Sequence, residues 1–96
     1  MQISYSEAYK YAEILEILSN PYALMICDHL FEKDEYISPE DLSEIVKTTE
    51  SKVEDILYDL EKRGIVDKDL VQGKYLYHAN SSTYAYFVQR LINLID

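Results

Sequence analysis

The sequence has little of the residue types that cross-link a small protein or break its helices. Its 96 residues include 1 Cys, 2 Gly, 2 Pro and no Trp. A single cysteine excludes an internal disulfide, and with only 2 His beside it the chain falls short of most structural zinc sites. The scarcity of Gly and Pro leaves little material for long loops, so a largely helical domain is favoured.

Long hydrophobic runs and basic residues are also scarce. The longest apolar runs are only a few residues, too short to cross a membrane, and the N-terminus lacks a basic leader followed by an apolar stretch. These absences predict a cytoplasmic protein with no membrane partner. With 9 Lys and Arg against 18 Asp and Glu, the net charge is −9, which lowers the affinity for phosphate groups.

The residues that are present describe one small globular domain. A hydrophobic fraction of 48% in 96 residues suits one core, and no repeat or linker divides the chain. We therefore treat residues 1–96 as a single domain. The chain also lacks a glycine-rich phosphate loop and any recognisable pairing of a nucleophile with a base, so we predict no enzymatic activity and no cofactor.

Capping signals and helical spacing predict two helices in the first third of the chain. Ser4-x-x-Glu7 matches a capping box, and the apolar residues behind it predict a helix over about residues 5–19. Asn20-Pro21 ends this helix and starts another, which runs to about residue 32 and is apolar nearly all round, so we expect it to be central and buried. The apolar residues of the first helix that recur at helical spacing are Ala8, Tyr11, Ala12, Leu15 and Leu18.

Two further helices follow with the spacing of a helix-turn-helix. Tyr36-Ile37 is expected to form a very short strand. Ser38 can cap the next helix, and Pro39 fits its first position. Thr49 can cap the next helix, which ends at Gly64. Two short helices joined by a turn of this length are what a helix-turn-helix requires.

A hairpin and an apolar helix complete the chain. Ile65-Val66 opens a strand, Gln72-Gly73 signals a turn, and the alternating residues from Lys74 to His78 predict the returning strand. After Ser81 or Ser82 we expect a last helix, whose broad apolar stripe runs to the end of the chain. A helix that apolar needs a partner.

The segment from Leu42 to Val66, with Thr49 and Gly64 at the bounds of its second helix, resembles the helix-turn-helix core of the ArsR-like winged-helix regulators. Residues 18–26 resemble that family's entry into its second helix, and the Gly73-Lys74 hairpin falls where the family carries its wing. The resemblance covers nearly the whole chain. It implies a mainly α fold with a small β-hairpin wing, in the order helix, helix, strand, helix, helix, strand, strand, helix.

The same resemblance implies a role for each part of the chain. The helix-turn-helix would occupy about residues 39–64, the wing about residues 65–79, and the dimerisation helices about residues 5–19 and 82–96. The implied function is a DNA-binding transcription regulator, a homodimer that reads an operator with two half-sites about one helical turn apart. The residues implied in groove contact are Thr49, Ser51, Lys52, Asp55 and Tyr58, and those implied in phosphate or wing contact are Lys47, Lys68, Gly73, Lys74 and Tyr75.

Apolar faces on both terminal helices predict a homodimer. A chain of this size, with a full helical core between those helices, has more apolar surface than one small core accepts. Two-fold pairs are also the commonest small oligomers. The alternative is that both stripes close the core of a monomer. The expected interface residues are Tyr5, Tyr9, Tyr84, Phe87, Val88, Leu91, Ile92 and Ile95.

Acidic residues set this chain apart from the family pattern. Residues 38–78 carry 6 Lys and Arg against 10 Asp and Glu, a net charge of −4, and several of these acids lie at residues 50–59. A carboxylate can accept a hydrogen bond from the amino group of cytosine, so we expect DNA binding that is moderate to weak and steeply salt-dependent. The alternative function is a protein-interaction module that keeps the fold, rejects DNA and holds a protein partner through the acidic helix.

The tripeptide Cys27-Asp28-His29 raises the question of a metal sensor, because some members of the resembled family sense metals through such residues. Its spacing argues against this role, since positions two apart on a helix point to different sides. Neither terminal helix supplies a matching cluster of ligands. We therefore predict no metal site, a buried free cysteine and a partly exposed histidine.

Overall fold

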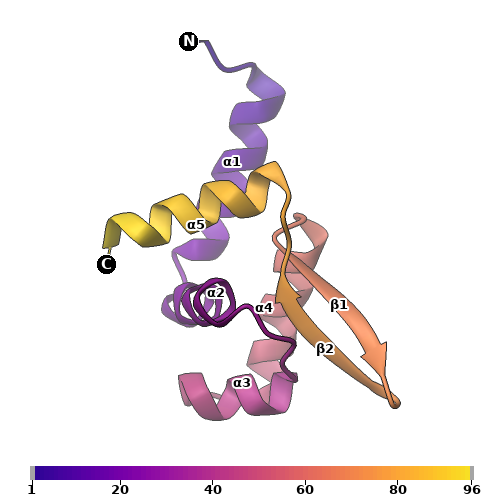
Figure 1. Ribbon diagram of the computed structural model, residues 1–96. Coiled ribbons are helices and arrows are strands. Elements are labelled where there is room, and N and C mark those ends of the chain that lie inside the picture. The colour runs from indigo at the N-terminus through magenta and orange to yellow at the C-terminus, as the bar shows by residue number, and fades with distance from the viewer. Residues whose placement is uncertain (1, 96) are drawn as a thin grey trace.

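Five helices and one antiparallel hairpin make up the computed structural model, which describes residues 2–95 (Figure 1). The outermost positions of the predicted domain, residues 1 and 96, lie outside the described part. The mainly α fold with a hairpin, expected from the sequence, is confirmed. In chain order the elements are α1 Tyr5–Leu18, α2 Pro21–Lys33, α3 Pro39–Val46, α4 Glu50–Lys62, β1 Val66–Val71, β2 Lys74–Ala79 and α5 Thr83–Ile95.

The first four helices each begin at a capping residue; Ser4, Ser38 and Thr49 are the caps predicted from the sequence, and the structure adds Asn20. In each case a side-chain oxygen accepts a hydrogen bond from a backbone N–H of the first turn, which satisfies a donor that the helix itself leaves unpaired. Pro21 and Pro39 lie in first turns, where no intrahelical N–H is needed. The capping bonds join Ser4 to Glu7, Asn20 to Tyr22, Ser38 to Asp41 and Thr49 to Lys52, at 2.9–3.2 Å.

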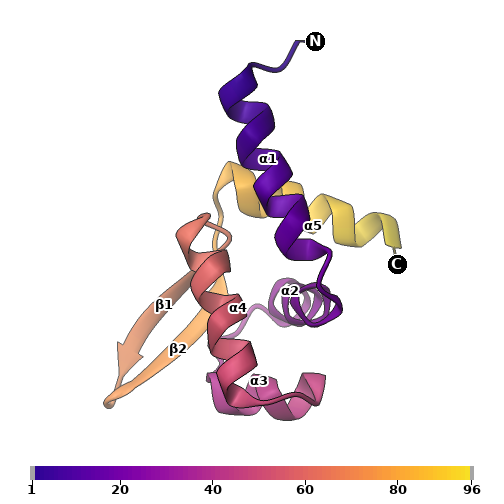
Figure 2. The ribbon, with the colours of Figure 1, turned by 180° about the vertical axis from the view of Figure 1, so that it is seen from behind.

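Helix α2 crosses the centre of the molecule, as its nearly continuous apolar sequence predicts. It packs against α1, α3, α5 and β2 (Figures 1 and 2). Its inward residues Ala23, Ile26, Cys27 and Leu30 are fully buried. Helices α3 and α4 and the base of the hairpin add Leu42, Val46, Val53, Leu57, Leu60, Ile65 and Val66 to this core, and α1 and α5 add Ile14, Leu18, Val88 and Ile92.

The inward face of α1 differs from the predicted one. Ile14 and Leu18 are buried, whereas Leu15 is 49% exposed and Ala12 is also exposed. Two apolar stripes lie side by side on this helix, and α2 and α4 cover the one that contains Ile14. The stripe that contains Ala12 and Leu15 is left on the surface.

The hairpin has the tight turn that Gln72-Gly73 predicts. Strands β1 and β2 pair antiparallel, with Val71 opposite Lys74, and Gln72 and Gly73 both have positive φ, at 51° and 78°. A two-residue turn with two positive φ values matches the twist of the strands that it joins.

The predicted strand at Tyr36-Ile37 is shorter than expected. Only Ile37 pairs, in a single bridge to Tyr77 of β2 with N–H···O distances of 2.9 and 2.8 Å. Ser38, the next residue, already caps α3, so the pairing does not extend beyond Ile37 on that side.

Within residues 2–95, none of the helices combines the length and the apolar composition needed to cross a bilayer.

Candidate nucleic-acid interface

A three-residue turn joins α3 to α4. Lys47 ends α3 in the left-handed conformation, with φ 61°, and its N–H donates to the carbonyl of Ser43. The N–H of Thr48 donates to the same carbonyl at 3.1 Å, and Thr49 then caps α4. Helix α3 packs against α4, which fixes the angle at which α4 is presented.

One face of α4 points away from the core. Val53, Ile56, Leu57 and Leu60 are buried, and because successive residues are 100° apart on a helix, the opposite face is defined by spacing alone. Tyr58 is an exposed aromatic side chain of this helix, at 62%. The residues of this outward face are Ser51, Asp55, Tyr58 and, at the far end, Lys62.

The acidic residues of α4 do not project together. Asp55 and Asp59 line a groove of about 570 Å³ between α4 and the start of α2, together with Lys52. Glu54 and Glu61 lie on the hairpin side. There the pKa of the Tyr77 phenol is raised, chiefly by burial, with the charges of Glu61 and Glu54 adding to the rise and that of Lys68 opposing it. The outward face therefore carries one acid, Asp55, and one base, Lys62.

The base of the hairpin is tied to α4. Lys68 Nζ lies 3.6 Å from Glu61 and 4.7 Å from the ring centroid of Tyr75. Asp67 accepts a hydrogen bond from the Asn80 amide at 2.5 Å. Asp69 contacts Tyr36, and desolvation followed by the charge and hydrogen bond of Asp69 raises the pKa of this phenol. Both hairpin acids are thus held by their own chain.

No protein-family model and no curated protein sequence matches this chain. Solved structures do match. The repressor BigR from Xylella fastidiosa is 24% identical, with a TM-score of 0.76, over 93% of this chain and 86% of that chain. The repressor PagR of Bacillus anthracis is 20% identical, with a TM-score of 0.76, over 97% of this chain and all of that chain.

A third match shows the fold most directly. It is described as the homodimeric winged helix-turn-helix DNA-binding domain of Mb0332 from Mycobacterium bovis, a possible ArsR-family regulator. It is 20% identical, with a TM-score of 0.72, over 98% of this chain and 83% of that chain. The chain has the winged helix-turn-helix fold. The fold implied by the resemblance to ArsR-like regulators is thereby confirmed, with α3 and α4 as the helix-turn-helix and β1–β2 as the wing.

In this winged helix, the residues implied in DNA contact fall into two groups. Ser51, Lys52, Asp55 and Tyr58 are exposed on α4, whereas the Thr49 hydroxyl is engaged in capping that helix. Lys47 lies in the turn of the helix-turn-helix, and Lys68, Gly73, Lys74 and Tyr75 lie on the wing beside α4 (Figure 2).

The four lysines implied in DNA contact have different surroundings. Lys68 is committed to Glu61 and Tyr75. Within residues 2–95, the exposed ammonium groups of Lys47, Lys52 and Lys74 make no hydrogen bond or ion pair.

The sequence analysis missed Lys62, although its position four residues after Tyr58 places it on the same face of α4.

The terminal helices of the winged helix carry two kinds of apolar residue. Val88 and Ile92 are buried in the core of this chain, and Tyr84, Phe87 and Leu91 are half-buried against it. Tyr11 of α1 makes edge contacts with Tyr84 and Phe87, at centroid distances of 5.4 and 4.7 Å. Of the residues expected at an interface, those that remain on the surface are Tyr5, Tyr9 and Ile95.

Periodicity overlooked two exposed residues of α5, Tyr86 and Leu94, which are 58% and 84% exposed. The N-terminal half of α1, with Tyr5 and Tyr9, extends away from the body of the molecule (Figures 1 and 2). Both terminal helices therefore keep exposed apolar residues, Tyr5 and Tyr9 on α1 and Tyr86, Leu94 and Ile95 on α5.

The Cys27-Asp28-His29 segment is placed as expected. Cys27 is fully buried, and burial raises the pKa of its thiol to about 12, so the thiol keeps its proton at neutral pH. His29 is half-buried, with Nε2 3.6 Å from Glu35. Over residues 2–95, no cluster of three or more His, Cys, Asp or Glu residues is arranged to hold a metal ion.

Proposed function

We propose that this winged helix is a DNA-binding transcription regulator that acts as a homodimer. The observation that carries the proposal is the distribution of acids around α4. Glu54 and Glu61 lie on the hairpin side and Asp59 lies at the groove with α2, so that Asp55 is the acid beside Ser51 and Tyr58 on the outward face. Similar folds described as transcriptional repressors support it. Such a regulator has no enzymatic step and works in the cytoplasm, where bacterial and archaeal DNA lies.

In this proposal α4 enters the major groove. Ser51, Lys52 and Tyr58 present hydrogen-bond donors to base edges or phosphates, and the Asp55 carboxylate accepts from a cytosine amino group. Lys47 and Lys74 neutralise phosphates on either side of the groove. Gly73 leaves the wing tip small enough to approach the backbone, with Tyr75 beside it.

The proposed dimer uses the exposed apolar residues of α1 and α5. Tyr5, Tyr9 and Leu15 lie on α1, and Leu94 and Ile95 end α5, all with large exposed fractions. A two-fold axis through this surface would duplicate α4 and the wing, so the operator would have two half-sites about 10 base pairs apart. The homodimeric state of the similar Mb0332 domain supports this arrangement.

The alternative of a protein-interaction module through an acidic helix is not favoured. It requires a continuous acidic surface at residues 50–59, whereas Glu54 lies on the wing side and Asp59 at the groove with α2, with Asp55 between them on the outward face. A basic partner would meet only part of this charge from any one direction.

The test is a selection from a pool of randomised duplexes, followed by binding titrations of the enriched sequence. With Lys47, Lys52 and Lys74 from two subunits on phosphates, affinity should fall about 1000-fold between about 50 and about 200 mM salt. Enrichment of a symmetric motif by a dimer is the expected result. A dimer that enriches no sequence and binds no duplex at the lower salt would overturn the proposal.

A further inference from the structure

Three of the nine basic residues of this acidic chain converge on one small cavity of about 260 Å³. It lies where α1, the end of α4 and the start of α5 meet. We call it the basic cavity; its lining residues are Lys10, Glu13, Ile14, Lys62, Arg63 and Tyr84. Since the chain has twice as many acids as bases, a local excess of two positive charges is a marked departure.

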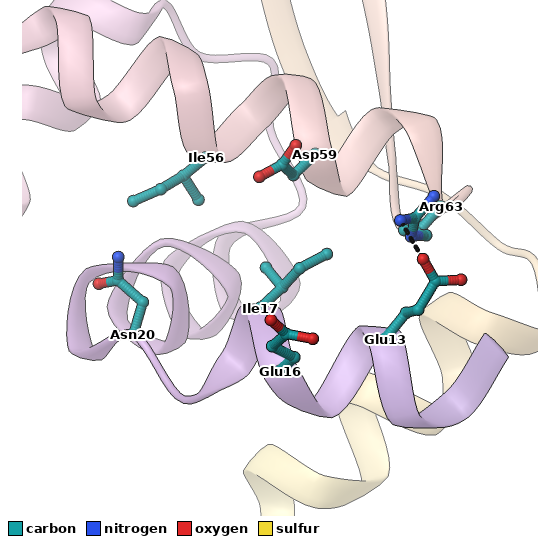
Figure 3. Close-up of a pocket in the computed structure, with 7 residues that line it drawn as sticks. All are labelled: Glu13, Glu16, Ile17, Asn20, Ile56, Asp59 and Arg63. Carbon is teal, nitrogen blue, oxygen red and sulfur yellow. Dashed lines mark hydrogen bonds and ion pairs between the residues drawn. The ribbon is translucent and has the colours of Figure 1, made fainter. Parts of the chain in front are cut away.

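An ion pair forms one wall of the basic cavity. Arg63 Nη2 donates to Glu13 Oε2 at 2.5 Å, which joins α4 to α1 (Figure 3). On its other side lies a separate groove lined by Glu16 and Asp59, so the pair divides a negative lining from a positive one. Arg63 Nε is buried and finds no acceptor within residues 2–95, so the guanidinium keeps an unused donor.

The other walls are apolar and rigid. Ile14 is 1% exposed, and the Tyr84 ring is fixed by its edge contact with Tyr11. The cavity is smaller than the range of about 300–1,000 Å³ typical of drug-sized ligands, so it suits only a small molecule. A lining that combines three cations with an isoleucine and an aromatic ring suits a ligand with a charged end and an apolar end.

We propose that the basic cavity binds a small aryl carboxylate. The carboxylate lies between the ammonium groups of Lys10 and Lys62, which are exposed and make no ion pair or hydrogen bond within residues 2–95. The aryl ring packs on Ile14 and Tyr84. A single negative charge fits better than a dianion, because the carboxylate of Glu13 also lines the cavity.

Such a ligand contacts three helices at once. Its carboxylate lies beside the Glu13–Arg63 ion pair at the C-cap of α4, and so changes how α4 is held against α1. If the proposed function holds, the ligand and DNA alter each other's affinity by the same factor. Binding of the ligand itself does not depend on that function.

The test is a titration of the ¹⁵N-labelled full chain with benzoate, followed by amide chemical shifts in the absence of DNA. We expect saturable shifts at Ile14, Lys62 and Tyr84, and an apparent Kd raised at least about fivefold in Lys10→Gln and in Lys62→Gln. Lys33→Gln, with the same charge change at the end of α2, is the matched control and leaves the Kd unchanged.

Two further probes fix the ligand class. Benzyl alcohol lacks the charge and inorganic phosphate lacks the ring, so each should bind more weakly than benzoate. Equal binding of benzyl alcohol would remove the role of the lysines, and equal binding of phosphate would remove that of the aryl wall. Absence of benzoate shifts at these amides would overturn the proposal while leaving DNA binding open to its own test.

Discussion

The surroundings of its lysine side chains determine how this acidic chain would bind a polyanion such as the proposed DNA. Lys47, Lys52 and Lys74 are exposed and unpaired within residues 2–95, whereas Lys68 is held by Glu61 and Tyr75. From the sequence all four are predicted alike to contact DNA, because the sequence does not show which lysine forms an ion pair with a carboxylate. That distinction depends on the packing of β1 against α4.

Charge reversal at the exposed lysines tests their role. We expect Lys52→Glu and Lys74→Glu each to reduce DNA affinity by at least about tenfold and to lower the salt dependence by about two phosphate contacts per dimer. The measurement is a titration of the selected duplex at several salt concentrations, with the oligomeric state checked by light scattering. Lys33→Glu is the control, and equal affinity in all three variants would remove α4 and the wing from the interface.

The Cys27 thiol predicts a pH dependence of stability. Burial raises its pKa from 9.0 to about 12, so above pH 9 the unfolded chain loses this proton while the folded chain keeps it. The contribution of the thiol to stability is therefore complete below pH 9 and declines as pH rises toward 12. Between pH of about 8 and about 10.5 the loss should be about 2 kcal/mol.

Urea unfolding of the wild type and Cys27→Ala at the two pH values measures this loss. The variant has no thiol to ionise, so the difference between the two proteins should shrink at the higher pH. A difference that is constant with pH would show that the thiol ionises as readily in the folded chain as in the unfolded one.

At the scale of elements, the sequence predicts helix caps and turns well, but it does not predict which face of a helix is buried. The capping residues of α1 to α4 and the Gln72-Gly73 turn are determined by near neighbours, and the structure contains each of them. The inward face of α1 is only partly right, because both stripes are apolar: Leu18 is buried and Tyr11 packs on the core as predicted, but Leu15 is exposed and Ile14 is buried. Only the positions of α2 and α4 decide between them.

The start of α5 shows how tertiary structure selects between equivalent residues. Ser81 and Ser82 are both candidate caps by sequence. In the structure the Ser82 hydroxyl accepts from the N–H of Ala85 at 3.1 Å and donates to the carbonyl of Gly64 at 2.5 Å. The second bond lies across the fold, at the end of the α4 segment, where sequence spacing has no information.

Replacing these serines tests the assignment. Ser82→Ala should lower the free energy of unfolding by about 1–2 kcal/mol, because it removes a helix cap and leaves a carbonyl without its partner. Ser81→Ala removes an exposed hydroxyl and should change it by less than about 0.5 kcal/mol. Chemical denaturation measures both, and equal effects would contradict the role given to Ser82.

At the scale of the whole molecule, α5 is apolar enough to serve two purposes. Val88 and Ile92 close the core of this chain, while Leu94 and Ile95 stay on the surface. In the sequence all these residues belong to one broad apolar stripe, so the core residues and the surface residues are predicted together as a single interface. Their separation depends on the angle at which α5 lies over α2.

Leu94→Glu tests the proposed dimer without disturbing the core, because Leu94 is 84% exposed. We expect monomers with unchanged helix content, since a charge at an apolar interface must be desolvated. Leu70→Glu, at a wing residue that is 63% exposed, is the matched control and should remain a dimer. Light scattering over a range of concentrations measures the mass, and a normal Leu94→Glu dimer would exclude this end of α5 from the interface.

The contact of Lys68 with Glu61 of α4 has a consequence for how DNA would be selected. With the hairpin held against α4 by the Lys68–Glu61 ion pair, the separation between α4 and the wing tip is set before any duplex is bound. The duplex must then adjust to the protein. The energy of that adjustment depends on the stiffness and groove width of base steps that no side chain touches. Part of the operator's sequence preference would therefore arise from its flexibility.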